Sequence, residues 1–89
     1  MNQNITLLIS CQEKGKIYNI EIDADSLVEE LIAEFTELLN ASNQSVSFLY
    51  HQRRLEPKQS FRSQGVVKGS QLELILKHHG GYIIFNQNE

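Results

Sequence analysis

The chain has 89 residues and a formal net charge of -3, because eleven Asp and Glu residues outnumber eight Lys and Arg residues. A chain of this length folds as one compact domain, and one sheet with very few helices must supply its core, which leaves little room for a deep active site. Nucleic-acid binding is also disfavoured, because contacts to phosphates need clustered positive charge.

The charged residues are divided along the chain. Acidic residues dominate the stretch 23–37, and basic residues dominate the stretch 53–77. Such a division is typical of two solvated faces. It also fits an electrostatic docking surface for protein partners, and both interpretations stay open.

Two β-prone segments, residues 5–11 and 16–22, predict an opening β-hairpin with Gly15 in the turn between them. The apolar side of the second segment carries Tyr18, Ile20 and Ile22. Cys11 is the only cysteine, which excludes an internal disulfide and a multi-cysteine metal site. We expect it to be a half-buried strand residue.

The next segment changes its apolar period and predicts one amphipathic helix of about 13 residues. Ser26 followed by Glu29 is the pattern of a capping box, which favours a helix that begins directly behind Ser26. The apolar stripe consists of Val28, Leu31, Phe35 and Leu38. Residues 40–43 then end the helix.

Residues 46–50 and 71–77 alternate in polarity and predict two further strands. Between them, residues 51–65 predict a turn, a short strand around Leu55 and irregular chain anchored by Phe61. The order of elements predicts an α+β fold, in which one helix packs on one face of a mixed sheet.

Two apolar residues, Leu49 and Ile75, occupy outward positions of the predicted strands, where polar residues are expected. If the two strands are neighbours, these residues form an exposed apolar spot flanked by His51, Arg53 and Lys77. Single surface leucines need no functional explanation. A patch that binds a protein partner is the competing interpretation.

The stretches 48–56 and 72–81, together with the order of elements, resemble the ubiquitin family. The similarity runs without an insertion over residues 28–81. It implies a ubiquitin-like β-grasp domain over residues 1–77, with Leu49 and Ile75 on the hydrophobic recognition patch of that family. It also places Lys68 and Lys16 at positions of chain-forming lysines, whereas Arg53 replaces the most used one.

Several residues depart from the family pattern. Gln52 stands where the family usually has a glycine, and Glu73 replaces a histidine beside the patch. Ser63 and Gln64 replace an Asp-Tyr pair that pins the following loop. These departures favour a dedicated set of partner enzymes over the enzymes of ubiquitin itself.

The resemblance gives a meaning to Gly80 and Gly81, which follow the last predicted strand. Residues 78–81 would form a flexible conjugation tail, and residues 82–89 a C-terminal extension that a protease removes after Gly81. If the extension instead stays attached, its β-prone run 82–85 could add an edge strand to the sheet.

The implied function is that of a precursor of a ubiquitin-like protein modifier, which is a substrate and not an enzyme. An activating enzyme would use ATP to adenylate Gly81, a conjugating enzyme would hold it as a thioester, and target lysines would receive it. A processing and deconjugating protease completes the partners, and no cofactor, nucleic acid or membrane is expected to bind. A β-grasp sulfur carrier with a thiocarboxylate at Gly81 and a non-conjugated interaction domain remain alternatives.

The imidazoles do not indicate a metal site. The histidines are His51, His78 and His79. Adjacent side chains on an extended segment point to opposite sides, so His78 and His79 do not form a chelating pair. No catalytic signature or phosphate-binding loop is present in the sequence. We expect a monomer in the cytoplasm, and also in the nucleus if the source is a eukaryote.

Overall fold

The computed structural model describes residues 4–41 and 43–78. Within these residues the elements, in chain order, are β1 (Asn4–Cys11), β2 (Lys16–Asp23), α1 (Val28–Leu38), β3 (Gln44–Tyr50), β4 (Arg53–Arg54), the 3-10 helix η1 (Arg62–Gln64) and β5 (Gln71–His78). Each predicted strand is present with bounds shifted by two residues or fewer, and η1 was not predicted. The part of the chain described here contains no helix that is long and apolar enough to cross a membrane.

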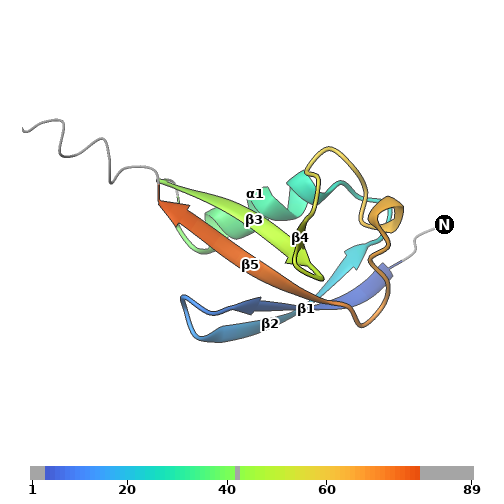
Figure 1. Cartoon of the computed structure of the whole chain (residues 1–89), viewed down its shortest axis with the longest axis horizontal. Helices are drawn as coiled ribbons and strands as arrows, with labels where there is room; N and C mark the ends of the chain where they lie inside the picture. The colour runs from blue at the N-terminus through green and yellow to red at the C-terminus, as the bar shows by residue number, and fades with distance from the viewer. Residues whose placement is uncertain (1–3, 42, 79–89) are drawn as a thin grey trace, which may run out of the picture.

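The strands form one sheet in the order β2-β1-β5-β3-β4 (Figure 1). β1 and β5 pair in parallel at its centre, and the other neighbours pair antiparallel. α1 packs on one face, mainly over β3. The predicted α+β arrangement of a mixed sheet with one helix on one face is therefore confirmed.

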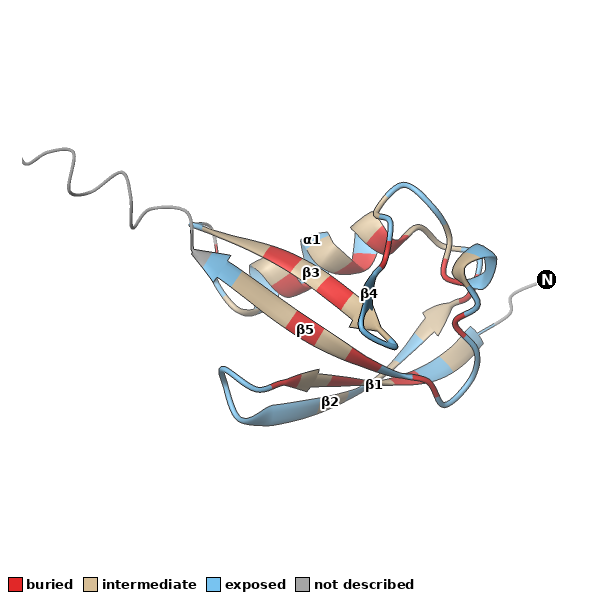
Figure 2. Cartoon of the chain, viewed as in Figure 1, coloured by how far each residue is buried: buried red, intermediate tan, exposed pale blue. Residues whose placement is uncertain are grey.

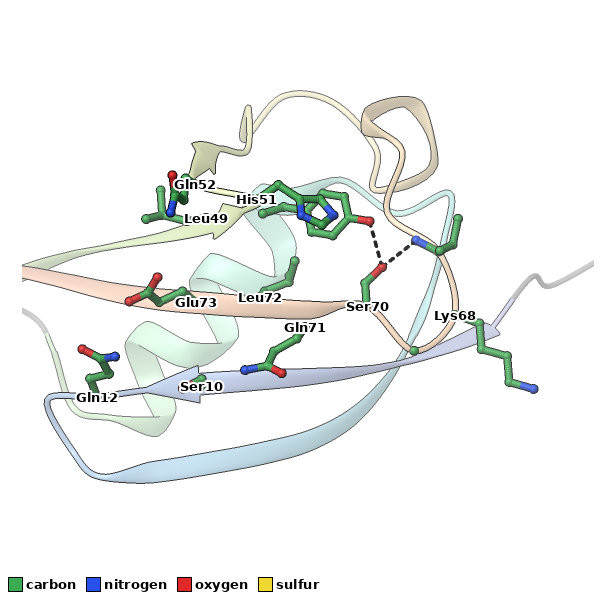
Figure 3. Close-up of a pocket in the computed structure, with 13 residues that line it drawn as sticks. Ser10, Gln12, Leu49, His51, Gln52, Lys68, Ser70, Gln71, Leu72 and Glu73 are labelled. Atoms are coloured by element: carbon green, nitrogen blue, oxygen red, sulfur yellow. Dashed lines mark hydrogen bonds between the residues drawn. The ribbon is translucent and has the colours of Figure 1, made fainter.

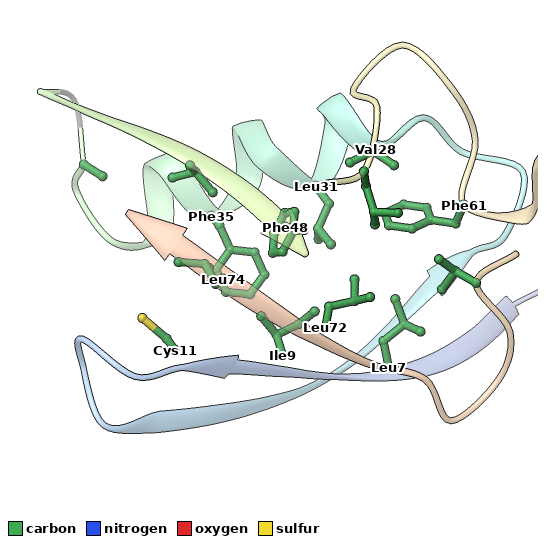
Figure 4. Packing of buried hydrophobic residues seen from close by; sticks show 14 residues of the cluster. Leu7, Ile9, Cys11, Val28, Leu31, Phe35, Phe48, Phe61, Leu72 and Leu74 are labelled. Carbon is green, nitrogen blue, oxygen red and sulfur yellow. The ribbon is translucent and has the colours of Figure 1, made fainter. Parts of the chain in front are cut away.

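The core lies between α1 and the sheet (Figure 4). Phe35 on the helix contacts Tyr18 of β2 edge to face at a centroid distance of 5.2 Å and Phe48 of β3 at 5.7 Å. Burial of each large apolar side chain in this layer contributes about 1.5–3 kcal/mol to stability. Cys11 is fully buried and not half-buried as expected, because it faces the same side of β1 as Ile9.

The start of α1 differs from the prediction. The residue before the helix is Leu27, and the Ser26 hydroxyl donates instead to the Asp23 carbonyl at 2.6 Å. The carboxylate that reaches back belongs to Glu30, which accepts the Leu27 N–H at 3.5 Å. The predicted capping box of Ser26 and Glu29 is therefore wrong.

A distant loop satisfies the first N–H groups of the helix instead. The Val28 N–H donates to the Gln59 carbonyl at 3.0 Å, and the Glu29 N–H donates to the Pro57 carbonyl at 2.9 Å. The Glu29 carboxylate also pairs with the Lys58 ammonium at 3.0 Å. Backbone groups at a helix start need such partners, and here tertiary structure supplies them in place of a local side chain.

Candidate protein-docking face

The face of the sheet that lies opposite α1 carries the two outward apolar residues. In the register of β3 and β5, Leu49 lies opposite Glu73, and Ile75 lies opposite Ser47. Leu49 and Ile75 are thus diagonal neighbours on one face, a placement in which side chains are typically about 7–8 Å apart. Both are half-buried. The structure brings this predicted pair together as one apolar spot, called the outer patch below.

The charged residues around the outer patch are only partly those expected. Lys77 lies opposite Ser45 on the same face and is exposed. β4 places Arg54 opposite Leu49, and Arg53 opposite Tyr50. Because successive residues of a strand point to opposite faces, Arg54 and not Arg53 shares the face of Leu49. A two-residue turn after Tyr50, read from the sequence, could have indicated this register.

His51 lies in the turn between β3 and β4, beside the outer patch. Its ring contacts the Tyr50 ring at a centroid distance of 4.1 Å. His51 and Gln52 both have positive φ, 53° and 65°. A two-residue hairpin turn with positive φ at both positions favours glycine or asparagine, so this turn carries backbone strain.

An open hollow of about 590 Å³ begins beside Leu49 (Figure 3). Its walls come from the β3–β4 turn, the loop before β5 and the end of β1, and they include Leu49, His51, Lys68 and Glu73. Lys68, proposed as a chain-forming lysine, thus lies beside the hollow and is exposed. Lys16 lies elsewhere, at the exposed start of the edge strand β2.

A polar network that the sequence did not indicate forms the back of the hollow. The buried Ser70 hydroxyl accepts the Val67 N–H at 3.1 Å and donates to the Tyr50 hydroxyl at 3.3 Å. These bonds join the loop before β5 to the end of β3 (Figure 3). Hydrogen bonds between two separate segments therefore brace this side of the hollow.

Among residues 4–41 and 43–78, no cluster of three or more His, Cys, Asp or Glu side chains is arranged to hold a metal ion. β5 extends to His78, one residue further than expected. Gly80 and Gly81 lie outside the described residues, as do His79 and the extension 82–89.

Comparison with known proteins found a family match that covers the folded domain. The family model described as ubiquitin-2 like Rad60 SUMO-like matches residues 5–76. No curated relative matches the chain. The match includes the outer patch and stops before the glycine pair.

Three solved structures are similar to the chain. An N-terminal ubiquitin-like domain in the 4931431F19Rik protein has a TM-score of 0.76 at 13% identity, over 91% of this chain and 82% of that one. A structure described as molecular mimicry of SUMO that promotes DNA repair has a TM-score of 0.71 at 20% identity, over 84% and 94%. A de novo design based on ubiquitin has a TM-score of 0.68 at 23% identity, over 82% and 88%. Identities this low show the shared ubiquitin-like fold alone.

Proposed function

Because the chain belongs to the ubiquitin-2 like Rad60 SUMO-like family, we propose that it is a protein modifier whose Gly81 carboxylate becomes joined to lysine side chains of target proteins. The observation that carries this proposal is the position of the glycine pair. β5 is described as far as His78, and in the sequence Gly80-Gly81 follow after a single residue.

The proposed chemistry begins with hydrolysis of the Gly81–Tyr82 peptide bond, which frees the Gly81 carboxylate. That carboxylate attacks the α-phosphorus of ATP on an activating enzyme and releases pyrophosphate. An enzyme cysteine thiolate then displaces AMP and forms a thioester, and a lysine amine displaces the thiolate to form the isopeptide bond. Two residues without Cβ allow the close backbone approach that narrow enzyme clefts require.

In this proposal the outer patch is the surface that partner proteins recognise. Leu49 and Ile75 supply apolar contact, while Arg54 and Lys77 supply positive charge on the same face. A complementary partner would present an apolar centre with acidic residues around it. The enzymes that activate, conjugate and process the chain, and the receptors that read it, would share this surface.

Intact mass measurement tests the proposed processing. The full chain with an N-terminal tag is expressed in its native host and recovered, beside a Gly81→Val variant that obstructs cleavage. The expected product lacks only residues 82–89, and the variant retains them. A product cut elsewhere, or uncut chain throughout, contradicts the proposal. A sulfur-for-oxygen mass gain at the freed end would indicate a sulfur carrier instead.

A non-covalent docking domain is the second candidate, and a specific observation favours it. The family match covers residues 5–76 and therefore the whole outer patch, but not Gly80-Gly81. If docking is the function, Gly81→Ala retains the cellular phenotype and Leu49→Asp abolishes it. If conjugation is the function, Gly81→Ala abolishes it as well.

A further inference from the structure

One carboxylate lies in the middle of the apolar outer patch. Glu73 of β5 is the direct neighbour of Leu49 on β3 and of Ser10 on β1 (Figure 3). Ile75 follows two residues later on β5, and alternate residues of a strand share a face. Glu73 therefore lies on the same face as both apolar residues of the outer patch and is in contact range of each.

This carboxylate is half-buried and has no cationic partner. From Leu72 to Ile75 the residues of β5 alternate between buried and half-buried, and Glu73 is one of the half-buried ones (Figure 2). Within residues 4–41 and 43–78, no ion pair or hydrogen bond engages the Glu73 side chain. The carboxylates of Glu29 and Asp25, in contrast, are each paired with a cation. Glu73 therefore depends on water for the solvation of its charge.

The cations of this face lie around the outer patch and not beside Glu73. Arg54 is separated from it by Leu49, which amounts to two strand spacings or about 10 Å between backbones. Lys77 lies four residue steps further along β5, or about 13 Å. Figure 3 shows the Lys68 side chain directed away from Glu73. The outer patch thus has a negative centre inside a positive rim.

Two open hollows share this carboxylate as part of their walls. The hollow of about 590 Å³ is lined by Leu49, and a second hollow of about 210 Å³ is lined by Ile75. Gln12 and Glu73 line both hollows, and Glu13 also lines the second. A side chain that enters either hollow would meet the Glu73 carboxylate with the Gln12 amide nearby. Such a wall suits a side chain that carries positive charge and several hydrogen-bond donors.

A partner that contacts both Leu49 and Ile75 must also cover Glu73. Covering it removes water from the carboxylate, and a charge that is buried without an opposite charge opposes binding strongly. Arginine is the side chain best suited to relieve this cost, because its planar guanidinium can bond both oxygens of a carboxylate. We propose that partner proteins of the outer patch place an arginine against the Glu73 carboxylate, between the apolar residues that contact Leu49 and Ile75.

This inference rests on the proposed use of the outer patch for docking, and it names the chemistry of the partner. The partner surface has an arginine at its centre, apolar contacts beside it and acidic residues facing Arg54 and Lys77. A partner with an acidic or apolar residue at the centre is rejected, because Glu73 would then be buried without a counter-charge. Binding at the outer patch does not use Gly81, so this inference and the conjugation chemistry can fail separately.

The first test selects peptides from a randomised display library on the full chain. Peptides are kept only if Leu49→Ala weakens their binding, which assigns them to the outer patch. We expect the kept peptides to be enriched in an arginine between apolar residues. The same selection on the Glu73→Arg variant should enrich Asp or Glu at that place. Absence of any Leu49-dependent peptide, or no enrichment of arginine among those found, overturns the proposal.

Affinity measurements on the most enriched peptide separate the charge pair from general effects. Glu73→Gln keeps the shape of the side chain and removes its charge, so it should weaken binding roughly 30-fold or more, as loss of one member of a buried charge pair does. Glu37→Gln removes an exposed carboxylate of α1, on the opposite face of the sheet, and should leave the affinity unchanged. Thermal melting of both variants checks that they are folded. Equal affinities of the two variants overturn the proposal.

A charge reversal tests the pairing itself. A peptide with glutamate in place of its arginine should lose binding to the natural chain and regain it with the Glu73→Arg variant. Failure of this exchange to restore binding overturns the direct contact with Glu73. Gly81→Ala should leave every peptide affinity unchanged, so loss of conjugation in that variant counts against the proposed function and not against this pairing.

Discussion

The side-chain amide of Gln64 forms hydrogen bonds with both the backbone N–H and the backbone carbonyl of Glu56. The Gln64 side-chain Oε1 accepts the Glu56 N–H at 2.6 Å, and Nε2 donates to the Glu56 carbonyl at 3.1 Å. Nε2 also donates to the Ser60 carbonyl at 3.2 Å. A single amide side chain therefore closes the loop whose carbonyls cap the start of α1. Gln64 occupies one of the two positions where the family resemblance places an Asp-Tyr pair, and in this chain its amide holds the loop that precedes it.

Removal of the Gln64 amide should loosen that loop and weaken the helix start with it. We expect Gln64→Ala to lower the free energy of unfolding by about 1–2 kcal/mol, since each net hydrogen bond contributes about 0.5–1.5 kcal/mol. Gln59→Ala is the matched control, because Gln59 is exposed and uses its backbone carbonyl, not its side chain, in this loop. Urea denaturation measures both, and equal stabilities of the two variants would contradict the assignment.

The strained turn after β3 should be improved by glycine. We expect Gln52→Gly to raise the free energy of unfolding by about 0.5–1 kcal/mol. The substitution removes the cost of about 1–2 kcal/mol that a non-glycine residue has in a left-handed conformation. Part of this gain is offset because glycine also gives the unfolded chain more conformational entropy. Gln12→Gly, in a turn position without positive φ, should instead destabilise the domain. Thermal melting gives the sign of each change, and a stabilising Gln12→Gly or a destabilising Gln52→Gly would refute the account.

The ion pair of Asp25 and Arg62 gives a pH-dependent contribution to stability. The Arg62 guanidinium donates to both Asp25 carboxylate oxygens, at 2.7 and 3.4 Å, and this hydrogen bond lowers the pKa of Asp25 from its usual 3.8. A carboxyl group with a lowered pKa in the folded state stabilises the fold above its unfolded pKa. That contribution is lost as the pH falls through the folded pKa.

A double-mutant cycle with Asp25→Asn and Arg62→Gln measures this coupling directly. The coupling energy should be favourable at about pH 7 and shrink as the pH falls below about 4 and through the lowered pKa of Asp25. Because the pair is exposed, added salt should also reduce the coupling. A coupling that persists at the lowest pH would show that ionisation of Asp25 is not its source.

The outer patch should contribute to recognition much more than to stability. Leu49→Ala and Ile75→Ala should each cost about 1 kcal/mol of unfolding free energy, because both side chains are only half-buried, whereas Phe48→Ala in the core should cost about 3–5 kcal/mol. Both patch variants should slow processing and conjugation in host extract. Ile17→Ala, which removes a 69% exposed apolar side chain on β2, should leave those rates unchanged.

The elements and their order were predictable from the sequence because the local signals agree with the tertiary structure. Alternation in β2 and β5 marks the face that packs on the core, as do Val28, Leu31 and Phe35 of the α1 stripe. The stripe was wrong at its last member, because Leu38 is 63% exposed. The beginning of α1 was not predictable in the same way. Its first N–H groups bond to carbonyls of Pro57 and Gln59, about thirty residues away in sequence, and no local pattern records that contact.

The candidate site was predictable in its apolar part and not in its polar surroundings. Leu49 and Ile75 stood out because they break the polarity of otherwise regular strands. Arg53 was predicted beside Leu49, but Arg54 shares its face. The difference depends on the register of the two-residue strand β4, which is set by a turn that lacks the usual glycine. The bond between Ser70 and Tyr50 joins residues far apart in sequence, and the role of Gly80 and Gly81 stays a prediction.

The central claim is that Gly81 becomes covalently joined to other proteins. The most direct measurement is mass spectrometry of crosslinked peptides from native host cells that express the tagged chain or its Gly81→Ala variant. The account predicts peptides in which the Gly81 carbonyl carbon is bonded to a target lysine Nζ, present with the natural residue and lost with the variant. Recovery of the chain only with residues 82–89 still attached, and with no such peptide, would contradict it.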